Sequence, residues 1–252
     1  MFTATEAYDR HVGRYSRQLG RKLMAAADVR PGQSALDIGC GPGALTVELV
    51  AVLGAQNVAA AEPSEPFAQA CAQRTGADVK IAAAEALPFA DNTFDVTLSQ
   101  LVVNFMRDAH QGLSEMARVT RPGGTVAAAV WDYRGEMTLL RTFWDTATAL
   151  DPAATDKDEA RSMRFATPEE LEALWTSRLQ DVDVADAVAS ADYEGFEDLW
   201  APFAKGVGPA GAYVVALGDH EPFKAEFRRR LDVGDEPFTL TARAWIVTGT
   251  TR

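Results

Sequence analysis

The stretch Leu36-Asp37-Ile38-Gly39-Cys40-Gly41-Pro42-Gly43-Ala44-Leu45-Thr46 decides the fold. It ends a short apolar run, Ser34 to Gly39, that indicates a buried strand, and it opens an apolar segment, Ala44 to Leu53, that indicates a helix. Glycines between a strand and a helix let the backbone turn sharply and expose N–H groups to a ligand at the helix N-terminus. The sequence therefore predicts a strand–turn–helix unit with a ligand-binding loop at its turn.

The same alternation of short apolar strands and helices continues toward residue 132. Five strands separated by helices are typical of an α/β fold, in which a parallel sheet carries helices on both faces. Right-handed crossovers make such a sheet doubly wound. Two segments of alternating pattern, Val182 to Val188 and Thr239 to Thr248, indicate further strands. The first five strands are predicted at Ser34 to Gly39, Asn57 to Ala61, Val79 to Ala83, Thr93 to Ser99 and Thr125 to Trp131.

Helical spacing of apolar residues outlines the remaining elements. A first helix is expected from Ala7 to Val29, and two more at Phe196 to Ala204 and Pro222 to Leu231. The latter two lie in an insertion of about 50 residues between strands, which is long for a connection and typical of a lid or substrate site. We expect a single domain over the whole chain, with a cofactor-binding core at 30–132 and a helical cap at about 190–238.

Composition excludes several classes of protein. Hydrophobic residues make up 47% and charged residues 24% of the 252 residues, as in packed globular proteins. The net charge of −12 argues against the basic face that nucleic-acid binding requires. The apolar runs fall short of the roughly 20 residues of a membrane span, and the N-terminus lacks the apolar segment of a signal peptide. Two cysteines, Cys40 and Cys71, cannot form a disulfide framework, so we expect a cytoplasmic enzyme.

The glycine loop supports two interpretations. As G-x-G-x-x-A, through Gly39, Gly41 and Ala44, it matches the dinucleotide fingerprint, with Glu62 placed to hold a ribose diol. This interpretation predicts an NAD-dependent oxidoreductase.

The alternative is D-x-G-x-G-x-G, beginning at Asp37. A carboxylate two residues before the first glycine suits a ligand with an ammonium group and no phosphate, which describes S-adenosylmethionine. Pro42 would also alter the helix entry that a pyrophosphate needs.

Several ordered motifs together resemble the class I S-adenosylmethionine-dependent methyltransferases. They are LDIGCGPGALT at 36–46, AAAEPS around Glu62, AEALPFADNTFDV, and SQLVVNFMRD followed by EMARVTRPGG. The group most similar in pattern comprises the ubiquinone and menaquinone biosynthesis C-methyltransferases, and the resemblance covers roughly Tyr8 to Asp132. It implies a Rossmann-like, seven-stranded sheet with an antiparallel last strand. It further implies methyl transfer from S-adenosylmethionine to a small organic acceptor, with release of S-adenosylhomocysteine.

The resemblance also implies cofactor contacts. The loop glycines would form the floor under the methionine part, with Asp37 near its ammonium group. Glu62 would accept both ribose hydroxyls, Pro63 would pack on the adenine, and Arg14 would meet the methionine carboxylate. The residues expected to contact the cofactor are Arg14, Tyr15, Asp37, Gly39, Cys40, Gly41, Gly43, Glu62, Pro63, Ala84, Glu85, Gln100 and Val102.

One position departs from the family pattern. Relatives carry an Asp or Asn that reads the adenine amino group where this chain has Ala83. Either Glu85 takes over this contact or adenine is held less specifically. A cofactor-binding protein without transfer activity is therefore a third interpretation. Cys40 is expected to be a small buried residue, because nothing basic stands beside it.

The sequence assigns no catalytic residue. Displacement from a sulfonium depends on alignment and exclusion of water, so a general base is needed only if the acceptor must lose a proton. The candidates for such a base are His110, His220 and Tyr15. No cluster has metal-ligand spacing. The aromatic residues of the insertion are expected to form a small core and in part to line the acceptor pocket, which suggests a mid-sized, partly apolar acceptor.

Overall fold

The computed structural model describes residues 13–252 and separates into two compact units. The first, here the sheet unit, comprises Ser16–Trp131, Arg164–Ala187 and Ala244–Arg252. The second, the helical unit, comprises Asp132–Met163 and Val188–Arg243 together with the described residues before Ser16. The helix α2, Gly13–Ala26, begins in the helical unit and continues in the sheet unit.

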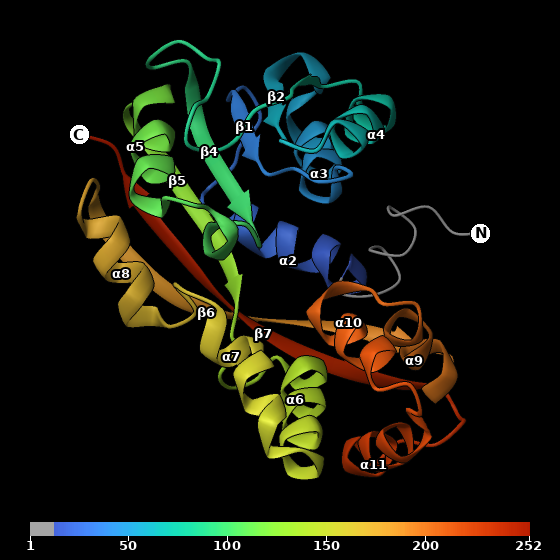
Figure 1. The fold of residues 1–252 in the computed structure, drawn as a ribbon. Coiled ribbons are helices and arrows are strands. Elements are labelled where there is room, and N and C mark those ends of the chain that lie inside the picture. The colour runs from blue at the N-terminus through green and yellow to red at the C-terminus, as the bar shows by residue number, and fades with distance from the viewer. Residues whose placement is uncertain (1–12) are drawn as a thin grey trace. The chain divides into compact units, whose positions relative to one another are not determined.

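A seven-stranded sheet with the strand order β3-β2-β1-β4-β5-β7-β6 organises the sheet unit (Figure 1). The pairs from β3 to β5 are parallel, and β7 is antiparallel to β5. This confirms the predicted doubly wound sheet with an antiparallel last strand. The strands are β1 (Ala35–Ile38), β2 (Val58–Ala61), β3 (Asp78–Lys80), β4 (Phe94–Gln100), β5 (Thr120–Trp131), β6 (Gln180–Tyr193) and β7 (Phe238–Thr250).

Burial explains why the central strands have uninterrupted apolar sequences. Every residue of β1 and β2 is buried, as expected when helices cover both faces of a parallel sheet. The Asp108 side chain caps α5 by accepting a hydrogen bond from the Gln111 N–H, and Thr167 caps α8 in the same way. The covering helices after α2 are α3 (Ala44–Leu53), α4 (Glu65–Thr75), α5 (Ala109–Val119) and α8 (Pro168–Thr176).

Several predicted boundaries differ from the structure. Strand β5 begins at Thr120, five residues before its predicted start, because Thr120 already pairs with Phe94 of β4. Strand β6 ends at Tyr193, five residues after its predicted end. The third strand is shorter and earlier, at Asp78–Lys80, because the residues after Lys80 turn into the loop that precedes β4. The first helix is described from Gly13 to Ala26, and the predicted residues 7–12 lie outside the described residues.

The helical unit is built around stacked aromatic rings. The Phe143 ring stacks on Phe203 with centroids 4.9 Å apart, and Phe223 and Phe227 pack against the same ring. All four side chains are buried, so the expected small aromatic core is confirmed. The helices of this unit are α6 (Thr138–Leu150), α7 (Glu159–Ser162), α9 (Phe196–Ala204), α10 (Gly208–Ala216) and α11 (Glu221–Leu231), with a short 3-10 segment at Pro152–Lys157.

The helical unit is larger than the predicted cap. The segment at about 190–238 lies inside it, and 132–163 belongs to the same compact unit. Helices α9 and α11 were predicted from their apolar spacing, whereas α6 and α10 were not.

Candidate cofactor site

The three loop glycines have different surroundings, although all adopt positive φ angles. A β-carbon on Gly39 would lie 2.4 Å from the Val102 side chain, and one on Gly43 would lie 3.0 Å from Cys71 Sγ. A β-carbon on Gly41 would meet nothing within 4 Å. Gly39 and Gly43 are therefore required by packing, whereas Gly41 leaves its backbone open to a ligand.

Glu62 follows β2 and turns its carboxylate toward this open glycine. Its Oε2 atom accepts the Gly41 N–H at 3.0 Å, and its Oε1 atom accepts the Ser64 N–H at 2.9 Å. The side chain is buried, with the residue 7% exposed. Because each carboxylate oxygen has two lone pairs, both oxygens retain the capacity to accept a ligand hydroxyl.

Asp37 lies in β1, next to the loop, and is 1% exposed. The Thr46 hydroxyl donates to its Oδ2 atom at 2.6 Å, while Oδ1 is buried with no hydrogen-bond partner among the described residues. Burial raises the pKa of this carboxyl to about 7. A buried oxygen that lacks a donor favours a ligand that brings one, and an ammonium group brings three.

Thr46 was not singled out from the sequence. It is the third residue of α3, within the first turn, and its hydroxyl reaches Asp37 in the preceding strand. The available signal in the sequence was a hydroxyl nine residues after the acidic position.

Cys40 is a packed loop residue. It forms a buried cluster with Ala60 and Cys71. A hydrogen bond with the Cys71 sulfur, together with burial, raises the pKa of the Cys40 thiol. This confirms the expected small buried residue and disfavours a nucleophilic thiolate.

The end of β4 approaches the loop from the neighbouring strand. The Gln100 amide donates to the Ser16 carbonyl of α2 at 3.1 Å, and Val102 lies over Gly39. Between them, Leu101 has a φ of 63°, an unfavourable backbone angle for a leucine. Such strain is maintained only where the surrounding structure fixes it, and here it directs the chain away from the sheet beside the loop.

Among the residues predicted to contact adenine, Glu85 has unexpected partners. Ala84 is buried and Pro63 is exposed. The Glu85 carboxylate accepts the backbone N–H groups of Arg107 at 2.8 Å and Asp108 at 3.3 Å. Glu85 therefore holds the start of α5, an interaction that sequence reasoning missed because the partners lie more than twenty residues away.

The other predicted residues have separate surroundings. His110 is exposed in the first turn of α5, in the sheet unit. In the helical unit, His220 precedes α11 and its ring lies 5.8 Å from that of Trp200. The Tyr15 hydroxyl is buried 3.2 Å from that of Tyr193, and burial raises the pKa of Tyr15 well above its ordinary value. Arg14 pairs with Asp198 at 2.6 Å within the same unit.

The described part of the chain, 13–252, holds no group of three or more His, Cys, Asp or Glu side chains placed to bind a metal ion. Within the same range, no helix has the length and apolar character to cross a membrane.

Comparison with known proteins identifies the family. Residues 36–128 match the model of a methyltransferase domain. An uncharacterized protein of Mycobacterium tuberculosis is 30% identical over 226 residues, which cover 84% of this chain and 78% of that protein. The chain belongs to the class I S-adenosylmethionine-dependent methyltransferases.

Relatives with named activities match over a shorter part. A malonyl-(acyl-carrier protein) O-methyltransferase of Erwinia billingiae is 38% identical over 123 residues, covering 49% of this chain and 48% of that protein. A demethylmenaquinone methyltransferase of Corynebacterium urealyticum is 47% identical over 112 residues, covering 43% and 46%. The chain thus spans about half the length of these two methyltransferases. The YcgJ protein of Bacillus subtilis shares the fold, with a TM-score of 0.57 and 16% identity over 94% of this chain and 98% of that protein.

The residues of the sheet unit fit the cofactor of this methyltransferase family, S-adenosylmethionine. The partnerless Asp37 oxygen suits its ammonium group, the open Gly41 backbone leaves room for it, and the Glu62 carboxylate suits its ribose hydroxyls.

Proposed function

We propose that this chain transfers the methyl group of S-adenosylmethionine to a small organic acceptor and releases S-adenosylhomocysteine. The observation that carries the proposal is the convergence of Asp37, Gly41 and Glu62 on one loop. A lone carboxylate can be structural, but a buried oxygen without a donor beside an open glycine and a second carboxylate is a site for a cationic ligand with a diol.

Each residue has a distinct task in this proposal. Asp37 accepts the ammonium group at Oδ1, and Glu62 accepts the ribose hydroxyls while its bond to Gly41 keeps the loop in place. Val102 and Gln100 line the methionine end, and Ala84 and Pro63 the adenine end. The bound cofactor supplies an activated methyl group on a sulfonium. The protein then contributes alignment and exclusion of water, the larger part of the rate enhancement in such a displacement.

A general base is not required by this chemistry. His110 and His220 are candidates where the acceptor must lose a proton, whereas the raised pKa and full burial of Tyr15 make it a poor base. The Arg14 contact with the methionine carboxylate stays a prediction, since Arg14 is paired with Asp198.

The acceptor is proposed only by class. One relative is named for O-methylation of a malonyl carrier protein and another for methylation of demethylmenaquinone, yet both match within about half of this chain. Cofactor binding is shared by such relatives, and acceptor choice is not. We propose a mid-sized, partly apolar molecule and, from the two free buried cysteines, a cytoplasmic location.

The cofactor assignment is tested by calorimetric titration with S-adenosylhomocysteine, with NADH in a parallel titration. We expect binding of the former and none of the latter. Glu62→Ala removes hydrogen bonds to a charged acceptor, at about 1.5–3 kcal/mol each, so its affinity should fall at least about tenfold. Glu65→Ala, three residues later on the exposed start of α4, is the control and should bind normally. Binding of NADH alone would establish the oxidoreductase interpretation instead.

A further inference from the structure

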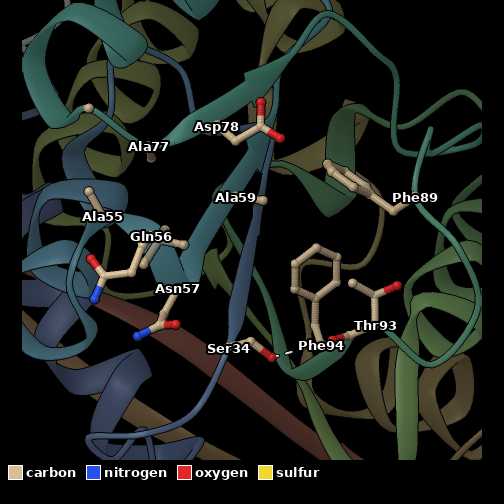
Figure 2. Close-up of a pocket in the computed structure, with 12 residues that line it drawn as sticks. Ser34, Ala55, Gln56, Asn57, Ala59, Ala77, Asp78, Phe89, Thr93 and Phe94 are labelled. Atoms are coloured by element: carbon tan, nitrogen blue, oxygen red, sulfur yellow. Dashed lines mark hydrogen bonds between the residues drawn. The ribbon is translucent and has the colours of Figure 1, made fainter.

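A pocket lies where the parallel strands begin (Figure 2). Ser34 precedes β1, Val58 opens β2, Asp78 opens β3 and Phe94 opens β4, and all four line it. The glycine loop follows the carboxyl end of β1, whereas this pocket lies at the amino ends of the strands. The two sites are therefore at opposite ends of the parallel strands. Its volume of about 740 Å³ is in the range of small-molecule sites.

The polar groups that line the pocket favour a cation. Asp78 is the charged lining residue, and no Lys, Arg or His is among the described residues that line it. Its carboxylate is 61% exposed and therefore accessible. Gln56, Asn57 and Thr93 add side-chain oxygens that can accept hydrogen bonds.

Two helix C-termini add negative charge at the same place. Helix α3 ends at Leu53, and the lining residues 55–59 follow it directly. Helix α4 ends at Thr75, and the lining residues 76–78 follow it. The C-terminus of a helix carries a partial negative charge of about half an electron, which stabilises a nearby cation.

One wall of the pocket is aromatic. Phe89 and Phe94 meet edge to face, with centroids 5.2 Å apart and planes at 83°. Figure 2 shows both rings on one side of Ala59, with Gln56 and Asn57 on the other. Aromatic faces bind flat apolar groups and attract cations, so the wall suits a ligand with an apolar body as well as a charge.

Asp78 has a partner that a ligand would replace. Lys80 Nζ lies 2.8 Å from the Asp78 carboxylate, on the same edge strand. Both side chains are largely exposed, and pairs of this kind contribute little to stability. An incoming ammonium group can therefore exchange with Lys80 at small cost.

We infer that this pocket binds a small organic cation with a flat apolar body, such as an arylalkylammonium ion. The carboxylate and the two helix ends recognise the charge, and the phenylalanine wall recognises the body. This site is separate from the cofactor loop, and its occupation does not depend on methyl transfer.

The test is a titration of the ¹⁵N-labelled full chain with 2-phenylethylammonium, followed by amide NMR shifts, in the presence and absence of S-adenosylhomocysteine. Saturable shifts are expected at Asn57, Ala77 and Thr93 under both conditions. Neutral 2-phenylethanol should bind about two- to fivefold more weakly, because it lacks the charge. Equal binding of the alcohol, shifts confined to the glycine loop, or no saturable shift would overturn the inference.

Variants separate the two parts of the recognition. Asp78→Asn should weaken 2-phenylethylammonium binding about two- to fivefold, and Phe89→Leu about threefold. Glu65→Gln removes the same charge from the opposite end of α4 and should leave the affinity unchanged. Asp78 is exposed, so its variant should fold. Wild-type affinity in Asp78→Asn, or an equal loss of affinity in Glu65→Gln, would contradict the inferred cation site at Asp78.

Discussion

At the scale of single residues, the surroundings of each glycine decide what its substitution does. Gly41 and Gly123 both have positive φ angles, of 53° and 74°, and a β-carbon on either would meet no atom within 4 Å. They differ in their neighbours, because only Gly41 donates its N–H to Glu62. Comparing the same substitution at both glycines therefore distinguishes the effect of backbone strain from the effect of blocking the proposed ligand site.

Gly41→Val should reduce S-adenosylhomocysteine affinity at least about tenfold, since a branched side chain fills the open space at the loop. Gly123→Val introduces similar strain and should bind the ligand normally. Calorimetry measures both affinities, and thermal unfolding measures both stabilities. Normal binding by Gly41→Val would remove the loop from the site.

Asp37 makes stability depend on pH. Its folded pKa of about 7 lies above the ordinary value of 3.8, so the folded state binds a proton that the unfolded state releases. The contribution of Asp37 to the free energy of unfolding should therefore fall as pH rises from about 4 to about 7, by an amount on the order of 4 kcal/mol, and be constant above. Asp37→Asn should lose this dependence and be the more stable protein at about pH 8. Urea unfolding at about pH 5 and about pH 8 checks this, and an unchanged slope with pH in Asp37→Asn would refute it.

At the scale of elements, the sequence predicted the strands and helices whose positions depend on their own local apolar and glycine patterns. The strands β1, β2 and β4 and the glycine loop have uninterrupted apolar or glycine-rich patterns, and their positions were predicted within about two residues. Helix α6 escaped prediction because it carries four threonines, which are β-branched and weak helix formers. Its buried face, which includes Phe143, Trp144 and Ala147, packs in the core of the helical unit, so packing rather than propensity maintains this helix.

The residues of the candidate site also fall into those that the sequence predicted and those that it did not. The residues of the loop and Glu62 followed from spacing, whereas the Thr46–Asp37 bond and the strained Leu101 depend on side-chain packing. Long-range partners were the least predictable. Arg14 pairs with Asp198, 184 residues away, and no local pattern specifies such a pair.

The hydrogen bonds between Glu85 and the start of α5 can be tested by substitution. It accepts the N–H groups of Arg107 and Asp108 at the start of α5, so Glu85→Ala should destabilise the protein by about 1–2 kcal/mol. Its S-adenosylhomocysteine affinity should change by less than about threefold. Thermal unfolding and calorimetry measure the two effects. A tenfold loss of affinity with unchanged stability would instead make Glu85 the adenine-reading residue in place of Ala83.

At the scale of the whole molecule, the division into two units separates binding from the aromatic core. The loop, Glu62 and the end of β4 all belong to the sheet unit, and the stacked rings around Phe143 belong to the helical unit. Strands β6 and β7 run through both units, so the chain connects them covalently more than once. Hydrogen exchange can show whether the two units unfold together or separately.

Phe143→Ala removes the ring against which five others pack, and such a truncation costs about 3–5 kcal/mol. If the units are separate cooperative units, hydrogen exchange should quicken in 132–163 and 188–243 while β1, β2 and β4 keep their protection. Val247→Ala, at a buried position of the sheet unit, is the matched control and should quicken exchange in the sheet instead. Exchange mass spectrometry on both variants reports the regions directly. Equal loss of protection across both units in Phe143→Ala would mean that the aromatic core stabilises the whole molecule, and that helical-unit variants cannot be used to probe the acceptor without disturbing the cofactor loop.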